Sequence, residues 1–386
     1  MAHVVILGGG FGGLAAANEA RTLLDDEHRV TVVSADDSFY MGFAKLWDLG
    51  GVRPLADGTR SLSGLARRGI EFVHGQITAI DPSSRMVTTT SGELEADVLV
   101  VALGAGPSPA QAEMLAANPR AFDLYDGLQL EAMKTAIAGL QEGTVVVGIL
   151  GGPFKCPPAP YEAAMLIDER LRSLDRRDQV ELVMVTPQPI TLPAAGPDAS
   201  RYVASFLEER NIRLRSGAPI TSVSGGDAKA DRTVAIDGSE SVQYDLFFGV
   251  PATSPPPVLA TSGLAGPSGF IHPDRHTLLT EFDDVYAIGD CTAIKTANGQ
   301  LPKAGVFAAG QGEVVARRIA AGLSGQEPPT FDGHGYCFLE VPGNKVAFVE
   351  GDFYADPPDV SLSEADEAQF RRKQAYETER LDAWLG

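Results

Sequence analysis

Residues 3–13 read HVVILGGGFGG, an apolar run followed at once by closely spaced glycines. Val4–Leu7 fits a buried strand, and the small residues of Leu14–Leu24 fit the helix after it. Glycines at positions 8, 10 and 13 give the G-x-G-x-x-G spacing of a strand–turn–helix unit. Such a turn lets backbone N–H groups approach a pyrophosphate. The stretch therefore predicts a dinucleotide-binding fold, and the residues expected at the ligand are Gly8, Gly10, Phe11, Gly12 and Gly13.

The strand predicted next, Arg29–Val33, ends in Ser34 and Ala35. In dinucleotide-binding folds an acidic residue commonly follows this strand and binds the ribose hydroxyls. A serine can also bond a hydroxyl, so we expect Ser34 and Ala35 to contact the nucleotide. The apolar run Val98–Leu103 leads into Gly104 and suits a strand beside the first one.

A second nucleotide turn is expected between the strand Thr144–Ile149 and the helix Tyr161–Leu174, and residues 151–160 read GGPFKCPPAP. Each proline removes an N–H donor and fixes φ, so a phosphate would find fewer partners here. A thiolate near a helix N-terminus can have a lowered pKa. We therefore expect Cys156 to be a redox cysteine at a position where a dinucleotide would otherwise bind.

The chain has 386 residues and a formal net charge of −20, with 44 % hydrophobic and 21 % charged residues. This length suits two or three domains with a large core. The charge argues against nucleic-acid binding and against broad attraction to anionic lipid. No apolar run approaches the roughly 18 residues of a membrane span, and a strand over His3–Leu7 leaves no room for a signal peptide. We expect a cytoplasmic protein, at most peripheral to the cytoplasmic membrane.

The cysteines and histidines limit the redox and metal chemistry. Cys156, Cys291 and Cys337 are too few for a structural disulfide framework, and in a reducing compartment a pair of them favours a catalytic role. The six histidines are scattered without metal-ligand spacing, so no metal site is predicted.

The first glycine turn, Val98–Gly104 and Ala287–Asp290 together resemble the flavoproteins of the pyridine nucleotide–disulfide oxidoreductase superfamily. The resemblance implies an α/β fold with two Rossmann-like dinucleotide-binding domains, the FAD domain split in sequence, and a short C-terminal domain. It implies that FAD is the cofactor, that the first turn binds its pyrophosphate and that Asp290 binds its ribityl chain. Further FAD contacts are implied for Lys45, Ile77, Ala102, Gly104 and Lys303.

The same resemblance sets the expected domain boundaries. Residues 1–115 and 255–325 would form the two parts of the FAD domain. Residues 116–254 would form the second Rossmann-like domain, which is not expected to bind NAD. Residues 326–386 would serve redox chemistry, dimer contact or docking of the electron acceptor.

Within the superfamily, Lys155–Glu162 is similar to sulfide:quinone oxidoreductases and to the flavoprotein subunit of flavocytochrome c sulfide dehydrogenase. Pro302-Lys303 and Cys337–Glu340 are further matches. The resemblance implies that Cys156 and Cys337 face the flavin, linked by a disulfide or a longer sulfur bridge. Many of these quinone enzymes carry a third cysteine upstream, and Ala121–Leu130 contains none.

The tail also departs from the quinone enzymes, which tend to finish with membrane-dipping helices. A final helix is expected from about Glu364, with Ser361–Glu364 as its capping box. The helix is heavily charged, and its apolar stripe of Phe370, Leu381, Trp384 and Leu385 is expected to pack against the protein itself.

The residues and the resemblance together give a hypothesis. Sulfide, or a small thiol or persulfide, would reduce the Cys156–Cys337 pair, and electrons would pass through FAD to a quinone or a soluble carrier. Glu162 would accept a proton from H₂S, unless it only satisfies the helix dipole. Lys303 would favour reduced flavin, unless it is a surface lysine at a helix start. Cys291 is expected to pack near the cofactor, and a homodimer is possible.

Two alternatives remain open from the sequence. An NAD(P)H-dependent flavin reductase of the type II NADH dehydrogenase or ferredoxin reductase kind would share the FAD residues, but it needs a working second glycine turn. A regulatory flavin-binding protein without turnover would need neither the cysteine pair nor Glu162.

Overall fold

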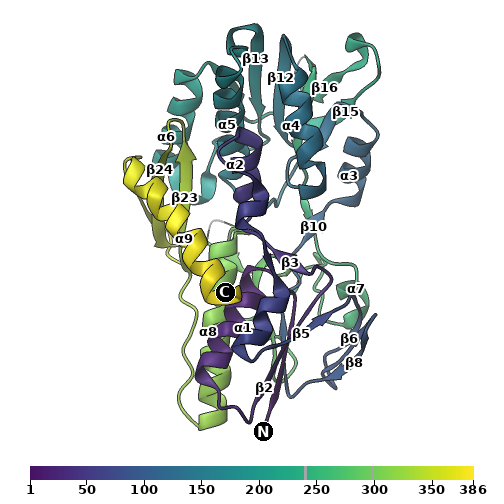
Figure 1. Ribbon diagram of the computed structural model, residues 1–386, viewed down its shortest axis with the longest axis vertical. Helices are drawn as coiled ribbons and strands as arrows, with labels where there is room; N and C mark the ends of the chain where they lie inside the picture. The colour runs from purple at the N-terminus through teal and green to yellow at the C-terminus, as the bar shows by residue number, and fades with distance from the viewer. Residues whose placement is uncertain (239–240, 298) are drawn as a thin grey trace.

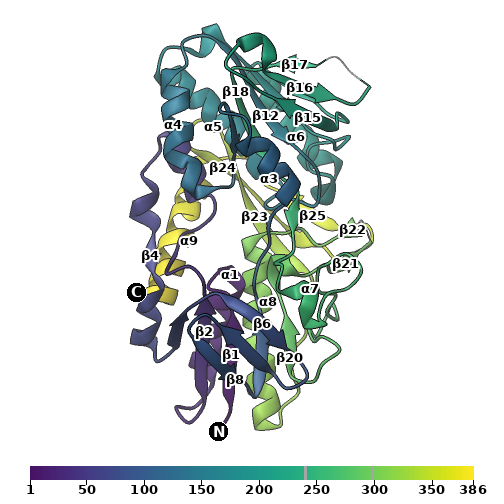
Figure 2. The same cartoon turned by 90° about the vertical axis from the view of Figure 1, so that its right-hand side faces the viewer.

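The computed structural model describes residues 1–238, 241–297 and 299–386. Two α/β bodies lie end to end along the long axis, and the C-terminal hairpin and helix lie along the joint between them (Figures 1 and 2). Each body contains a five-stranded parallel sheet. This arrangement confirms the predicted fold class.

The first sheet joins segments from both ends of the chain. Its order is β20 (Val285–Ala287), β9 (Val98–Val101), β1 (His3–Leu7), β2 (Arg29–Ser34) and β5 (Glu71–His74). The helices α1 (Phe11–Leu23) and α8 (Gly305–Ser324) lie side by side on one face. A Cβ on Gly312 of α8 would stand 2.4 Å from the Gly12 carbonyl oxygen of α1. Glycine is therefore required where these two helices touch.

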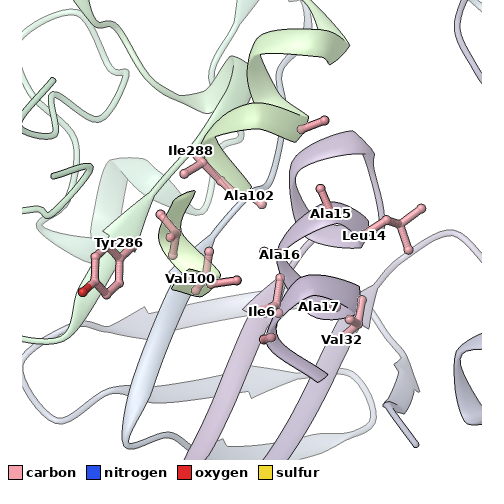
Figure 3. Packing of buried hydrophobic residues seen from close by; sticks show 14 of the residues in the cluster. Ile6, Leu14, Ala15, Ala16, Ala17, Val32, Val100, Ala102, Tyr286 and Ile288 are labelled. Carbon is pink, nitrogen blue, oxygen red and sulfur yellow. The ribbon is translucent and has the colours of Figure 1, made fainter. Parts of the chain in front are cut away.

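The core of this body is built from small and branched apolar side chains. Figure 3 shows side chains of β1, β2, β9, β20 and α1 meeting in one cluster. Ala15, Ala16 and Ala17 occupy α1 where it packs on Ile6 and Val32, and all five are buried. Short side chains on the helix let it approach the sheet closely, which places the start of α1 over the carboxyl ends of the strands.

The second sheet has the order β11 (Ala121–Asp123), β18 (Leu246–Val250), β12 (Gly143–Ile149), β13 (Val180–Val185) and β14 (Ile212–Arg215). Its helices are α3 (Pro109–Ala116), α4 (Leu130–Gly139), α5 (Ala159–Ser173) and α6 (Gly196–Glu209). Two short helices come from outside the segment that forms this sheet: α2 (Ala44–Gly50) precedes it in the chain, and α7 (Leu259–Ser262) follows it.

Antiparallel pieces complete the two bodies. The larger ones are β6–β8 (Ile77–Asp81, Met86–Thr89, Gly92–Glu95) and β15–β17 (Ile220–Ser224, Thr233–Ile236, Val242–Gln243). The smaller ones are the pairs β3–β4 (Ser38–Phe39, Arg60–Ser61), β10–β19 (Gly106–Pro107, Thr253–Ser254) and β21–β22 (Lys295–Thr296, Gly299–Gln300).

The C-terminal segment forms an antiparallel sheet and one helix: β23 (His334–Val341), β24 (Lys345–Asp352), β25 (Asp359–Leu362) and α9 (Glu367–Leu385). The predicted capping box is wrong, because Ser361 and Leu362 lie in β25 and the Ser363 hydroxyl accepts the N–H of Phe348. Helix α9 begins at Glu367 instead, and the Asp366 side chain caps it by accepting the N–H of Gln369.

The apolar stripe of α9 packs into the protein, as predicted. Phe370, Leu381, Trp384 and Leu385 are all buried, and the Trp384 ring contacts the rings of Phe11 and Phe39. Within the described residues, the search for a helix apolar and long enough to traverse a bilayer found none.

The N-cap of α9 can be tested by Asp366→Ala. Loss of the side-chain acceptor leaves the Gln369 N–H unpaired, so the free energy of unfolding should fall by about 1 kcal/mol. Urea denaturation measures this change, and Glu379→Ala, exposed on the same helix, serves as the control. Equal effects of the two substitutions would contradict the role of the cap.

Candidate active site

The first glycine turn lies where β1 ends, beside the ends of β2 and β9. The Gly8 N–H donates to the Val33 carbonyl at 2.8 Å. A Cβ on Gly13 would lie 1.9 Å from the Gly8 carbonyl oxygen, and a Cβ on Gly8 would lie 2.2 Å from that of Ala102. A Cβ on Gly10 would meet no atom of the described residues within 4 Å. The turn is thus packed at Gly8 and Gly13 and open at Gly10.

The other residues predicted from the strand ends surround this turn. Ser34 is buried, and a Cβ on Gly9 would stand 3.1 Å from its Oγ. The Ala35 carbonyl bonds the His74 ring at 2.9 Å. Gly104 has a φ of +65° and therefore needs the left-handed conformation that glycine adopts without strain.

Asp290 follows β20 in a short 3₁₀ turn and is linked to Lys303. The Lys303 Nζ donates to the backbone oxygens of Asp290 at 2.7 Å and of Thr292 at 2.8 Å. It also lies 3.9 Å from the centre of the Phe270 ring. Lys303 is only 6 % exposed, so the surface alternative is wrong. Burial raises the pKa of Asp290 and lowers that of Lys303, while their opposite charges counteract both shifts.

Lys45 and Ile77 lie in different surroundings. The Lys45 Nζ donates to the Tyr125 carbonyl of the second body. Burial lowers the pKa of Lys45 to about 8, and the nearby Lys155 ammonium adds to the effect. Ile77 starts β6 and packs, partly buried, against the core of the first body. Contact of either residue with a cofactor stays a prediction.

The proline-rich turn after β12 is anchored to the first body. The Cys156 N–H donates to the Lys303 carbonyl at 2.7 Å, and Lys155 and Lys303 form a parallel bridge. The Tyr125 hydroxyl donates to the Lys155 carbonyl at 2.7 Å. Cys156 itself has a φ of +47°, a left-handed conformation that is uncommon outside glycine. A backbone hydrogen bond at its own N–H and the Tyr125 hydroxyl at the preceding carbonyl hold this strained residue.

The fold brings the two predicted redox cysteines together. Cys337 lies on β23, and its thiol is near enough to the Cys156 thiol to interact with it. Both residues are half-buried free thiols. The expected lowering of the Cys156 pKa is wrong: the neighbouring Cys337 thiol and burial raise it well above its usual range. Cys291 is fully buried, and its Sγ donates to the Ile288 carbonyl at 3.2 Å.

Glu162 lies in the first turn of α5 and is buried behind the cysteines. Its Oε1 accepts the Glu340 N–H at 2.7 Å and lies 3.5 Å from the Lys373 Nζ. Burial raises the pKa of Glu162, and the Lys373 ammonium opposes that shift. The carboxylate therefore has specific partners, and the helix dipole alone does not account for it.

The family described as Pyridine nucleotide-disulphide oxidoreductase matches residues 2–312. The chain belongs to this family. It is an oxidoreductase and a flavoprotein, and its cofactor is FAD.

Individual relatives have low identity and long coverage. The mitochondrial sulfide:quinone oxidoreductase of Mus musculus is 24 % identical over 370 residues, which cover 92 % of this chain and 79 % of the relative. A sulfide-quinone reductase of Aquifex aeolicus is 27 % identical, and the match covers 82 % of this chain and 76 % of the relative. The solved structure of the sulfide:quinone oxidoreductase from Aquifex aeolicus has a TM-score of 0.84 at 23 % identity. The match covers 98 % of this chain and 90 % of the solved chain. This likeness supports the fold.

The residues of the first turn fit FAD. The open side of Gly10 leaves room for a pyrophosphate over the start of α1, where no side chain caps the helix. Lys303 bonds the backbone oxygen of Asp290, so the Asp290 carboxylate would be the group that binds the ribityl hydroxyls of FAD. When bound, FAD would supply a two-electron acceptor.

The sequence reasoning missed Lys373, Trp47 and Tyr125. One signal for Lys373 was present, because Phe370, Lys373 and Leu381 recur at helical spacing on one face of α9. A lysine inside an apolar stripe indicates a buried charge with a partner. Trp47 and Tyr125 gave no signal, because their bonds to Glu340 and to the Lys155 carbonyl depend on contacts far apart in sequence.

Gly10→Ala and Gly13→Ala separate cofactor binding from folding. Gly10 has extended backbone angles and open space, so alanine there should leave the apoprotein's thermal midpoint unchanged and weaken FAD on the order of tenfold. Gly13→Ala should lower the midpoint itself, because its Cβ would collide with the Gly8 carbonyl. Calorimetry of apoprotein and fluorescence titration with FAD measure both. Unchanged FAD affinity in Gly10→Ala would overturn the assignment.

Proposed function

We propose that this protein oxidises sulfide through Cys156 and Cys337 and passes the electrons through FAD to a quinone. The observation that carries the proposal is the meeting of two free thiols, Cys156 on the turn bonded to Lys303 and Cys337 on β23. The relatives named as sulfide:quinone oxidoreductases support it.

The cysteines divide the chemistry into two steps. In the oxidised pair, hydrosulfide attacks one sulfur of the Cys156–Cys337 disulfide, the S–S bond breaks, and a new S–S bond forms to the incoming sulfur. One cysteine becomes a persulfide, and the other leaves as a thiolate with the electron pair of the broken bond. In the second step this thiolate would give its electron pair to bound FAD, and the persulfide would re-form a sulfur bridge to it, so that two electrons and the persulfide proton would leave to FAD.

Glu162 prepares the donor. At neutral pH part of the sulfide is H₂S, and a carboxylate behind the cysteines can accept its proton and leave the nucleophilic HS⁻. The buried position of Glu162 raises its pKa toward neutrality and so improves it as a base. Lys303 donates to the backbone oxygen of Asp290, and there its ammonium would place a positive charge beside bound FAD.

The second turn opposes use of NAD(P)H. Pro153, Pro157 and Pro158 have no N–H to offer a pyrophosphate, and the Cys156 N–H is already bonded to Lys303. We therefore propose sulfide rather than a nicotinamide as the donor, although type II NADH:quinone oxidoreductases from Staphylococcus are relatives at 22 % identity.

The acceptor follows from the names of both groups of relatives, which all include a quinone. We propose a quinone as acceptor, with peripheral contact at the cytoplasmic membrane as the way to reach it. A soluble carrier stays the other prediction for the electron acceptor. A homodimer stays a prediction for the oligomeric state.

Stopped-flow mixing of oxidised protein with sulfide tests the cysteine pair. Cys156→Ser and Cys337→Ser should each slow flavin bleaching by a factor on the order of a hundred or more, because neither variant can form the disulfide that sulfide attacks. Cys291→Ser is the matched control and should change the rate less than about threefold, since its thiol packs among backbone carbonyls.

The donor is tested by anaerobic titration of the same protein with NADH. Sulfide should bleach the flavin within the mixing experiment and NADH should not. Bleaching by NADH at the rate seen with sulfide, or sulfide reduction at parental rate in both cysteine variants, would reject the proposed function.

A further inference from the structure

Three charged side chains from three elements meet behind the cysteine pair. Glu162 comes from α5, Glu340 from β23 and Lys373 from α9, and their side chains are 3 %, 4 % and 3 % exposed. The Lys373 Nζ lies 2.7 Å from the Glu340 Oε2 and 3.5 Å from the Glu162 Oε1. With every group ionised, the cluster holds two negative charges and one positive charge.

Hydrogen bonds fix this charged cluster in one arrangement. The Glu340 N–H donates to Glu162 Oε1, and the Trp47 Nε1–H donates to Glu340 Oε2, each at 2.7 Å. The Lys373 ammonium also lies 4.9 Å from the centre of the Phe43 ring. Since the backbone of Glu340 holds one carboxylate and the indole of Trp47 the other, the ammonium has one position between them.

The electrostatic effects within the cluster have opposite signs. Burial and the Glu340 carboxylate raise the pKa of Glu162, whereas Lys373 lowers it. Burial alone would lower the pKa of Lys373, but Glu162 and Glu340 outweigh burial and raise it. The Lys373 ammonium also lowers the pKa of Cys156, and Cys337 contributes to raising the pKa of Lys373. The titratable groups that face Glu162 or Lys373 are Cys156, Cys337, Tyr125 and Glu340.

We propose that Lys373 is a positioning residue for sulfide oxidation, whose ammonium keeps Glu162 ionised as a proton acceptor and favours the thiolate form of Cys156. Glu340 holds the ammonium in place. The inference rests on the proposed function, in which H₂S gives its proton to Glu162 and the resulting HS⁻ attacks the disulfide. Lys373 acts through these groups and does not itself exchange the proton.

The pH profile of flavin bleaching by sulfide tests the proposal with two variants. The rate rises with pH as Glu162 ionises. In Lys373→Met this rise should move to higher pH by about one unit or more, because a carboxylate neighbour remains without the cation. In Glu340→Gln it should move to lower pH, because the amide oxygen keeps its bonds to Lys373 and Trp47 but the repulsion is gone.

Arg371→Met is the control, since it removes a cation from the exposed face of the same helix and should leave the profile in place. Ionisation of H₂S itself contributes equally to every profile, so it cannot produce opposite shifts. Two shifts of the same sign, or a uniform loss of rate at all pH values, would reject the proposal in favour of a packing role.

Alkylation of the reduced protein by iodoacetamide gives a second measurement that needs neither sulfide nor turnover. The pH at which Cys156 becomes reactive, followed by mass spectrometry, should rise in Lys373→Met and stay unchanged in Arg371→Met. If sulfide fails to bleach the parent flavin but this rise is seen, the proposed function fails and the effect of Lys373 stands. An unchanged alkylation profile rejects the effect of Lys373. Should Lys373→Met not fold, the shift in Glu340→Gln decides.

Discussion

The hydrogen bond from the Cys156 N–H to the Lys303 carbonyl is the constraint on which the site depends. It joins the turn after β12 in the second body to the segment that precedes α8 in the first. Lys303 in turn bonds the Asp290 turn. Because backbone groups make this contact, it is kept whichever rotamers the side chains of Cys156 and Lys303 adopt. The left-handed backbone at Cys156 is maintained by the same bond and by the Tyr125 bond to Lys155.

The C-terminal segment completes the site from a third direction. Strand β23 supplies Cys337 and Glu340, and α9 supplies Lys373. Buried charges are costly, and removing one partner from such a group typically costs about 3–5 kcal/mol. The charged cluster therefore ties α9 and β23 to α5 more specifically than apolar packing would. The position of Cys337 against Cys156 depends on that attachment.

The parts of this structure that sequence reasoning predicted are those coded locally. Short motifs predict the first glycine turn, the strands beside it and the proline-rich turn that carries Cys156. The role of Cys337 was predicted from a resemblance. The raised pKa of Cys156 could not be predicted, because it depends on a thiol 181 positions away and on burial. The start of α9 was misplaced because Ser361 reads as a cap until β24 pairs with its strand. The alternative that Lys303 is a surface lysine could be rejected only because the structure shows this side chain buried against the Phe270 ring.

The second body keeps a dinucleotide-binding architecture while its turn has different chemistry. Strand β12 and helix α5 still position the turn at the carboxyl edge of a parallel sheet. In a nicotinamide site the N–H groups of such a turn point at phosphate oxygens. Here prolines have removed several of these donors, and the N–H of Cys156 bonds protein instead. The first helical turn carries Glu162, whose negative charge would repel a phosphate but suits proton transfer beside a thiol pair. The edge of the sheet at which a nicotinamide fold holds phosphate thus carries a cysteine and few N–H donors, which is the physical reason for proposing thiol chemistry there.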